Sequence, residues 1–189
     1  MGFLDILRGK RTLKQPAPDR LFAMSTAQVT METGMGLRSA GKAAIVFQPL
    51  ATADFEGIVR DMEEVVRGTG ADTGTQIDAR DDEYGYRWMV LADPDFDDLV
   101  VGVNAVSSAL EGGGYGERIL CAVFAFRDDR DRRVYWIYNY KRGAFYPFAP
   151  AGPQERDTER ELRLKAQIGT ELPIEAELER WFPLWGIPI

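Results

Sequence analysis

The chain has 189 residues, of which 45% are hydrophobic and 28% charged, values typical of a globular domain with a sizeable core. It has no histidine and one cysteine, Cys121, which excludes histidine-activated nucleophiles, imidazole metal ligands and intramolecular disulfides. A net charge of −7 disfavours nucleic acid, because phosphate recognition depends on clustered lysine and arginine. We therefore predict a protein that is not an enzyme and carries no cofactor or metal.

Residues 1–20 differ from the rest of the chain in charge. They hold five basic and two acidic side chains, a net charge of +3, so residues 21–189 carry −10 of the total of −7. Pro16 and Pro18 prevent a continuous helix, which predicts a stiff linker between this segment and a single domain at 21–189. The segment either contacts a membrane or partner weakly, or packs on its own domain. The residues that would make this contact are Phe3, Leu4, Ile6, Leu7, Arg8, Lys10 and Arg11.

The sequence also bears on localisation. No apolar run approaches the roughly 20 residues that a membrane-spanning helix needs. The opening stretch MGFLDILRGKR places its charge after a very short apolar patch, which is the reverse of a secretory signal peptide. We expect a cytoplasmic protein whose membrane contact, if made, is peripheral to the inner face.

Two stretches spaced 41 residues apart resemble each other. Residues 43–47 and 84–88 alternate like strands on the same face, and each is followed by an Asp-Phe pair that opens an amphipathic helix, with Asp54 and Asp95 as N-caps. With a further strand at 28–33, residues 26–112 would contain two strand–strand–helix units. A chance match of two amphipathic helices is the alternative. The two predicted helix faces are Phe55, Ile58, Val59, Met62 and Val65, and Phe96, Leu99, Val100, Val103 and Val106.

Acidic and glycine-rich stretches within this region invite other interpretations. Asp81-Asp82-Glu83 matches no calcium loop, since the glycine and the distal glutamate are missing, so we expect a solvated turn. The aspartates at 93–98 are explained by a helix N-terminus, where the helix dipole favours acids. The glycines at 112–116 follow a helix and precede a strand, the opposite order to a phosphate-binding loop.

Residues 119–148 predict the centre of the sheet, because their β-branched and aromatic runs are apolar on both faces. Cys121 lies inside the first run, so a buried structural thiol is expected. At the hairpin tip that follows, basic and aromatic residues form a candidate patch for an anion or acidic partner, although a turn between strands needs no such role. The residues of this predicted patch are Tyr140, Lys141, Arg142 and Tyr146.

The C-terminal quarter predicts a charged helix and an apolar tail. The helix should run from Pro153 to Ile168 with a narrow apolar stripe that includes Leu162. Large apolar side chains are unfavourable when fully exposed to water, and the tail carries Phe182, Leu184 and Trp185. The tail therefore either packs over the domain as a latch or forms a partner site.

Several motifs carry a family resemblance. The segments DEYGYRW at 82–88, YKRGAFYPFAP at 140–150 and LERWFPLWG at 178–186, with the MGFLDIL start, resemble the PspA-associated protein family PspAB. The resemblance implies an accessory role near PspA, with a PspA-like protein or a membrane protease of the HtpX type as partner. It assigns no catalytic or binding residue. The strand–strand–helix order is also similar to the YbjN and type III secretion chaperone-like folds.

These observations predict an α+β fold with a mostly antiparallel sheet of six or seven strands, covered by helices near 54–67, 96–111 and 154–168. The predicted function is that of a non-catalytic accessory protein of the envelope stress response, acting by protein contacts at the membrane surface. A chaperone-like or peptide-binding domain is the alternative.

Overall fold

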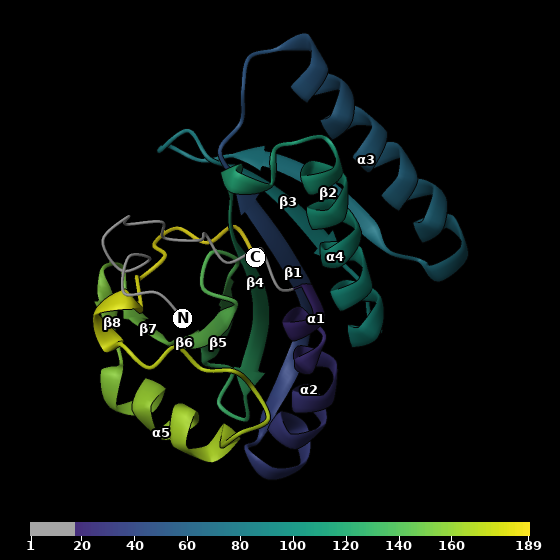
Figure 1. The fold of residues 1–189 in the computed structure, drawn as a ribbon. Helices are drawn as coiled ribbons and strands as arrows, with labels where there is room; N and C mark the ends of the chain where they lie inside the picture. The colour runs from purple at the N-terminus through teal and green to yellow at the C-terminus, as the bar shows by residue number, and fades with distance from the viewer. Residues whose placement is uncertain (1–17) are drawn as a thin grey trace, which may run out of the picture.

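A computed structural model describes residues 18–189, except for the side chains at 18–19, 65–66 and 69–73. Six strands form one antiparallel sheet in the order β2-β3-β1-β4-β5-β6 (Figure 1). The predicted central run is β4, which lies between β1 and β5, as expected for a strand that is apolar on both faces. The strands are β1 (Leu37–Phe47), β2 (Gln76–Asp81), β3 (Arg87–Ala92), β4 (Ile119–Asp128), β5 (Arg133–Asn139) and β6 (Ala144–Phe148), with a separate small pair, β7 (Pro150–Gly152) and β8 (Glu155–Arg156).

The helices confirm the predicted α+β class. In Figure 1 the first four lie on one side of the sheet, and the C-terminal tail runs along the other side. No helix in the described range is both long and apolar enough to cross a bilayer. The helices are α1 (Pro18–Leu21), α2 (Ala23–Gly34), α3 (Ala53–Thr73), α4 (Phe96–Gly112) and α5 (Thr158–Ile168), with short 3-10 turns η1 (Gly116–Arg118) and η2 (Leu178–Arg180).

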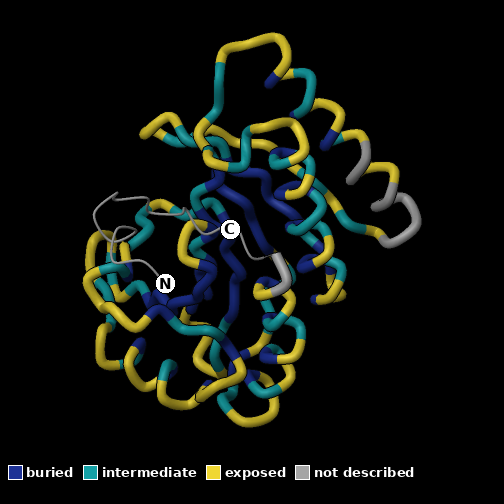
Figure 2. Tube along the Cα trace, in the orientation of Figure 1, coloured by how far each residue is buried: buried dark blue, intermediate teal, exposed yellow. Residues whose placement is uncertain are grey.

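Alternating side chains divide the sheet between two apolar clusters. On the helix face, residues such as Ile45, Phe124 and Trp136 pack against α2, α3, α4 and α5. On the opposite face, which we call the tail face, Val46 and Val123 pack with the last residues of the chain. The period of two along each strand produces this division, and Figure 2 shows the buried residues concentrated along the central strands.

The predicted strand at 28–33 is wrong, because these residues belong to α2. Met24, Ala27 and Met31 are fully buried at helical spacing, and this periodicity overrides the β-branched pair within the segment. The proposed strand correspondence also fails on orientation. Phe47 faces the helices, whereas its counterpart Trp88 lies in the tail-face cluster.

The helical half of the repeat is confirmed. All five predicted positions of α4 are buried, and in α3 Phe55, Val59 and Met62 are buried while Ile58 is partly buried against the same cluster. The side chain of Val65 lies outside the described residues. The two α3 and α4 faces therefore rest on one shared core.

The predicted caps hold for α4 alone. The Asp95 carboxylate accepts a hydrogen bond from the Asp97 amide at 2.9 Å. In α3, Asp54 lies within the first turn, and Thr52 takes the capping place by accepting from the Phe55 amide at 3.4 Å.

Helix α5 begins later than predicted, because the residues from Pro150 form the β7–β8 pair and Asp157 caps the helix instead. Its buried stripe is also rotated: Leu162 is 40% exposed, while Glu161 is completely buried. Burial of this carboxylate is made possible by Arg156, whose guanidinium donates to both carboxylate oxygens. Arg156 also donates to the Trp181 carbonyl, which ties the tail to α5.

Candidate functional site

The four residues of the predicted basic-aromatic patch do not form one surface. Tyr140 and Tyr146 are each 3% exposed, and they lie in the helix-face and tail-face clusters respectively. The Tyr146 hydroxyl donates to the Phe182 carbonyl at 3.0 Å. Burial raises the pKa of both tyrosine hydroxyls. The β5–β6 register places Tyr146 opposite Ile137 on the tail face, so the two rings lie on opposite sides of the sheet and do not share a surface with Lys141 and Arg142.

Arg142 has a structural role at the hairpin tip. Its Nε lies 2.8 Å from Oε2 of Glu175, a carboxylate that is 5% exposed, and its guanidinium lies 3.6 Å from Glu177. The hydrogen bond from Arg142 holds the pKa of Glu175 below its ordinary value, against the effect of burial. Lys141 remains exposed beside this pair, and its role in binding a partner stays a prediction.

The tail is bound to the sheet edge before it crosses the tail face. The Phe145 amide donates to the Pro173 carbonyl at 2.7 Å, and the Glu175 amide donates to the Phe145 carbonyl at 2.8 Å. Trp181 then buries its ring against Tyr146, and its indole nitrogen donates to the Glu175 carbonyl at 3.0 Å. These contacts cover the free edge of β6, a position where unpaired backbone groups invite association.

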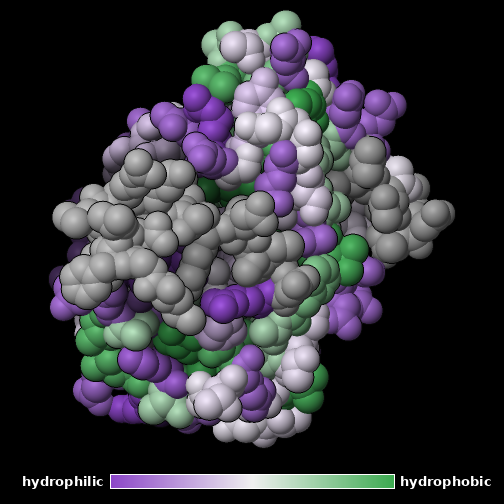
Figure 3. All heavy atoms as spheres, in the orientation of Figure 1, coloured by the Kyte–Doolittle hydropathy of each residue, from purple (hydrophilic) through white to green (hydrophobic). Residues whose placement is uncertain are grey.

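The tail prediction is confirmed as a latch for part of the strip. Trp181 is buried, and Trp185 packs edge-on against Phe148 with ring centroids 5.3 Å apart. Phe182 differs, since 59% of it is exposed, as is 44% of Leu178. Figure 3 shows apolar side chains gathered at the surface above α5, where the tail runs. The tail thus both closes the domain and presents apolar groups.

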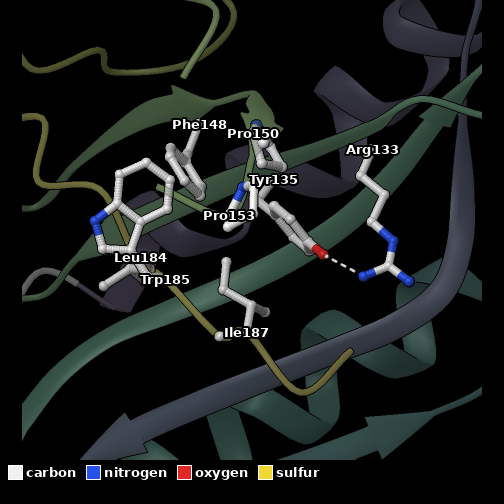
Figure 4. A pocket seen from close by; sticks show the side chains of 10 residues that line it. Arg133, Tyr135, Phe148, Pro150, Pro153, Leu184, Trp185 and Ile187 are labelled. Atoms are coloured by element: carbon white, nitrogen blue, oxygen red, sulfur yellow. Dashed lines mark hydrogen bonds between the residues drawn. The ribbon is translucent and has the colours of Figure 1, made fainter. Parts of the chain in front are cut away.

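A pocket of about 210 Å³ opens where the tail passes the ends of β5 and β6 (Figure 4). Tyr135 and Phe148 form its stacked aromatic wall, with centroids 6.3 Å apart, and Trp185 packs edge-on against Phe148 at an interplanar angle of 74°. We call it the aromatic pocket. It is lined by Arg133, Tyr135, Phe148, Pro150, Gly152, Pro153, Leu184, Trp185, Gly186 and Ile187.

Arg133 provides the charge at this pocket. Its guanidinium donates to the Tyr135 hydroxyl at 3.4 Å, and that hydroxyl donates to the Ile189 carbonyl at 2.9 Å. Among the side chains that the structure describes, Arg133 forms no ion pair, whereas the neighbouring Arg132 binds Asp128 at 2.9 Å. An exposed arginine beside an apolar space can bind a carboxylate by donating hydrogen bonds to it.

The volume of the aromatic pocket limits its occupant. Ligand sites for cofactors and drug-sized molecules are roughly 300–1,000 Å³. A cavity of about 150 Å³ holds one benzene molecule. At about 210 Å³, the pocket fits one aromatic, aliphatic or proline side chain. Its lining comes from two separate stretches, residues 133–153 and 184–187. The tryptophan- and proline-rich tail was the one sequence feature that pointed to a site in this region.

The other candidate groups have structural roles. Asp82 closes its turn by accepting from the amides of Tyr84 and Tyr86 and from the Trp88 indole, each at 2.9 Å. Burial raises the pKa of the Cys121 thiol to about 12, as expected for an inert thiol. In the part of the chain that the structure describes, no group of three His, Cys, Asp or Glu side chains is placed to hold a metal ion.

The predicted contact residues of the N-terminal segment lie outside the described residues. Their membrane or partner contact stays a prediction on sequence grounds. They are Phe3, Leu4, Ile6, Leu7, Arg8, Lys10 and Arg11.

Comparisons with known proteins and families identify a family for this chain. No curated protein and no solved structure matches the chain. The family model described as PspA associated protein B matches residues 1–189, which is the entire chain. This match covers all of the motifs that carried the resemblance, including the tail that builds the aromatic pocket. The chain belongs to the PspA-associated protein B family, PspAB.

Proposed function

We propose that this chain is a non-catalytic accessory protein of the PspA-type envelope stress response and acts by protein contacts at the inner face of the membrane. The observation that carries the proposal is the family match over residues 1–189, in a family described by its association with PspA. Its direct partner is a PspA-like protein or a membrane protease of the HtpX type.

The described structure supports contact rather than chemistry. The aromatic pocket has room for one side chain, and the tail beside it exposes Phe182 and Leu178. The two buried glutamates, Glu161 and Glu175, are each bound by an arginine, so their charge is already compensated. Aromatic side chains near an apolar hollow are typical of protein interfaces.

The N-terminal segment supplies the membrane contact in this proposal. Each basic residue near an anionic surface adds about 1 kcal/mol, screened by salt. The −10 charge of residues 21–189 opposes close approach. Four apolar side chains before the basic group add a small apolar term, so the association is weak, salt-sensitive and reversible.

Flotation with anionic liposomes tests the membrane contact. The full chain should float at low salt and be released at high salt, whereas a chain starting at Asp19 should remain at the bottom. A matched variant, Arg8→Glu with Lys10→Glu, should lose flotation without any change in the domain. Equal flotation of the full and shortened chains, or none by either in the presence and absence of PspA, would remove the membrane role.

The aromatic pocket also favours a second function, a chaperone-like or peptide-binding domain. Co-purification of the tagged full chain under envelope stress separates the two. Recovery of PspA or of a membrane protease as the dominant partner supports the accessory role. Recovery of many unrelated chains with exposed apolar segments, and neither of these partners, favours the chaperone-like function.

A further inference from the structure

The aromatic pocket places an apolar space for one ring next to Arg133, an arginine that forms no ion pair with any described side chain. A matching pattern occurs near the start of the chain, where Phe3 precedes Asp5 by two positions. In an extended segment, residues i and i+2 point to the same side. We propose that the aromatic pocket binds the chain's own N-terminal segment, with Phe3 in the pocket and Asp5 on Arg133.

The expected strength of this contact favours a tethered occupant over a separate partner. Burial of one apolar side chain and one exposed ion pair would give a free peptide a dissociation constant on the order of 1–30 mM. That is too weak for recruitment of a partner by the pocket alone. A segment on the same chain has an effective concentration on the order of mM. The pocket is then occupied for a substantial fraction of the time and released easily.

The tether is long enough to reach the pocket. The described chain begins beside the β5–β6 turn, where Arg20 donates to the Gly143 carbonyl at 3.3 Å. The pocket lies at the far end of β6, and the five residues of that strand span roughly 17 Å. Twelve residues separate Asp5 from Pro18, and they reach about 40 Å when extended. The segment can therefore pass round the sheet edge with length to spare.

The charges along this route complement those of the segment. The tail that borders β6 carries Glu171, Glu177 and Glu179, besides Glu175, whose charge Arg142 compensates, and its one basic residue is Arg180. Residues 8–14 of the N-terminal segment carry four basic side chains and no acidic one. A basic stretch that follows an acidic border is held near it by attraction, which orients the segment toward the pocket.

Docking would control access to Phe3. If the proposed membrane contact is correct, the same ring inserts into the bilayer, so the pocket and the membrane compete for it. This consequence rests on the proposed function, whereas the docking itself does not. A competition of this kind favours release near an anionic surface, where basic residues 8–14 gain attraction.

The test uses full-length protein labelled with 5-fluorotryptophan, and reads the ¹⁹F resonance of Trp185 in the pocket wall. Trp185→Phe assigns the signal among the four tryptophans. Phe3→Ala should move the Trp185 resonance, whereas Leu7→Ala, which also removes an apolar side chain, should leave it in place. An unmoved resonance in Phe3→Ala would overturn the proposal.

The ion pair is tested in variants that keep the aromatic side chains of the pocket unchanged. In an Arg133→Glu background, Phe3→Ala should move the resonance at most half as far as in the wild type. In Arg130→Glu, a charge change in the adjacent β4–β5 turn and outside the pocket, it should move as far as in the wild type. Asp5→Lys combined with Arg133→Glu should restore the full displacement. Equal displacements in every background would overturn the assignment of Asp5 to Arg133.

Anionic vesicles added to the wild-type protein distinguish this proposal from the membrane contact. A move of the Trp185 resonance to its Phe3→Ala position supports both docking and competition. A resonance that is sensitive to Phe3→Ala but unaffected by vesicles would overturn the competition and leave docking in place.

Discussion

The two faces of the central sheet are covered in different ways. On the helix face, α2, α3, α4 and α5 bury regular apolar stripes in one cluster. On the tail face, the described cover is the C-terminal strip, which contributes Trp181, Trp185 and Ile189 to a second cluster. Helices satisfy their own backbone hydrogen bonds. The backbone groups of an extended strip instead need partners elsewhere, and here they bond to the sheet edge and to the side chains of Arg156 and Tyr146.

We infer from this difference that the helix face provides most of the free energy of unfolding. The tail face is held by contacts that can open more easily. A packed helix cluster tolerates little change in volume. The strip leaves the aromatic pocket open and exposes 59% of Phe182. Segments held by few buried apolar contacts open at lower free energy than the core. The contacts proposed for a partner and for the N-terminal segment therefore fall on the face whose occupation would not disturb the helix-face core.

The largest expected effect comes from truncating the helix-face core. Leu99 is fully buried in α4, so Leu99→Ala should lower the free energy of unfolding by about 2–5 kcal/mol. Trp185→Ala removes a larger side chain but one that is only partly buried, and it should cost about 1–2 kcal/mol. Urea denaturation measures both. A greater loss for Trp185→Ala would show that the tail, and not the helix layer, dominates stability.

A smaller effect should follow from overfilling the contact of α4 with the sheet. A Cβ on Gly102 would overlap Cδ2 of Leu91, which is fully buried in β3, so Gly102→Ala should destabilise by about 1–3 kcal/mol. Gly57 in α3 is the matched control, because apart from its chain neighbours and the nearby backbone of its own helix no atom lies within 4 Å of its added Cβ. Gly57→Ala should stabilise by about 0.5–1 kcal/mol through helix propensity. Equal responses in thermal unfolding would contradict the tight contact of α4.

The sequence predicted the helix face better than the tail face for a physical reason. The apolar spacing of α3 and α4 is local, so it specifies both the helix and its buried side. The error at α2 arose where Val29 and Thr30 favour strand while Met24, Ala27 and Met31 favour helix, a conflict that packing resolves. Antiparallel pairing then placed Trp88 opposite Val46, which reversed the face assigned to the second strand.

The candidate site was harder to predict because it is made by long-range contacts. Tyr140 and Tyr146 are close in sequence but are sent to opposite faces of the sheet by the hairpin between them. Tyr135 and Trp185 are fifty positions apart and line the same pocket. The first pair could have been separated only from the register of the hairpin, because positions 140 and 146 would share a face in an unbroken strand. The second pair depends on the path of an extended tail, whose sequence has no periodicity that predicts it.

The smallest predicted effect concerns the ion pair that fastens the tail. Arg142 lowers the pKa of Glu175, so the folded protein binds this proton less readily than the unfolded chain. The pair therefore contributes its full stability above the unfolded pKa of a glutamate, about 4.3, and loses it as the pH falls through the lower folded value. Arg142→Gln should be less stable than the wild type at pH 7, and the difference in the free energy of unfolding should narrow below about pH 4.

Arg180→Gln is the control, since Arg180 pairs with the more exposed Glu177 at 2.8 Å and should show a smaller difference from the wild type at pH 7. Urea midpoints measured from pH 7 to pH 3 provide the comparison, and common acid effects cancel in the differences. A gap between wild type and Arg142→Gln that stays constant across this range would show that the arginine acts through packing of its side chain and not through the charge of Glu175.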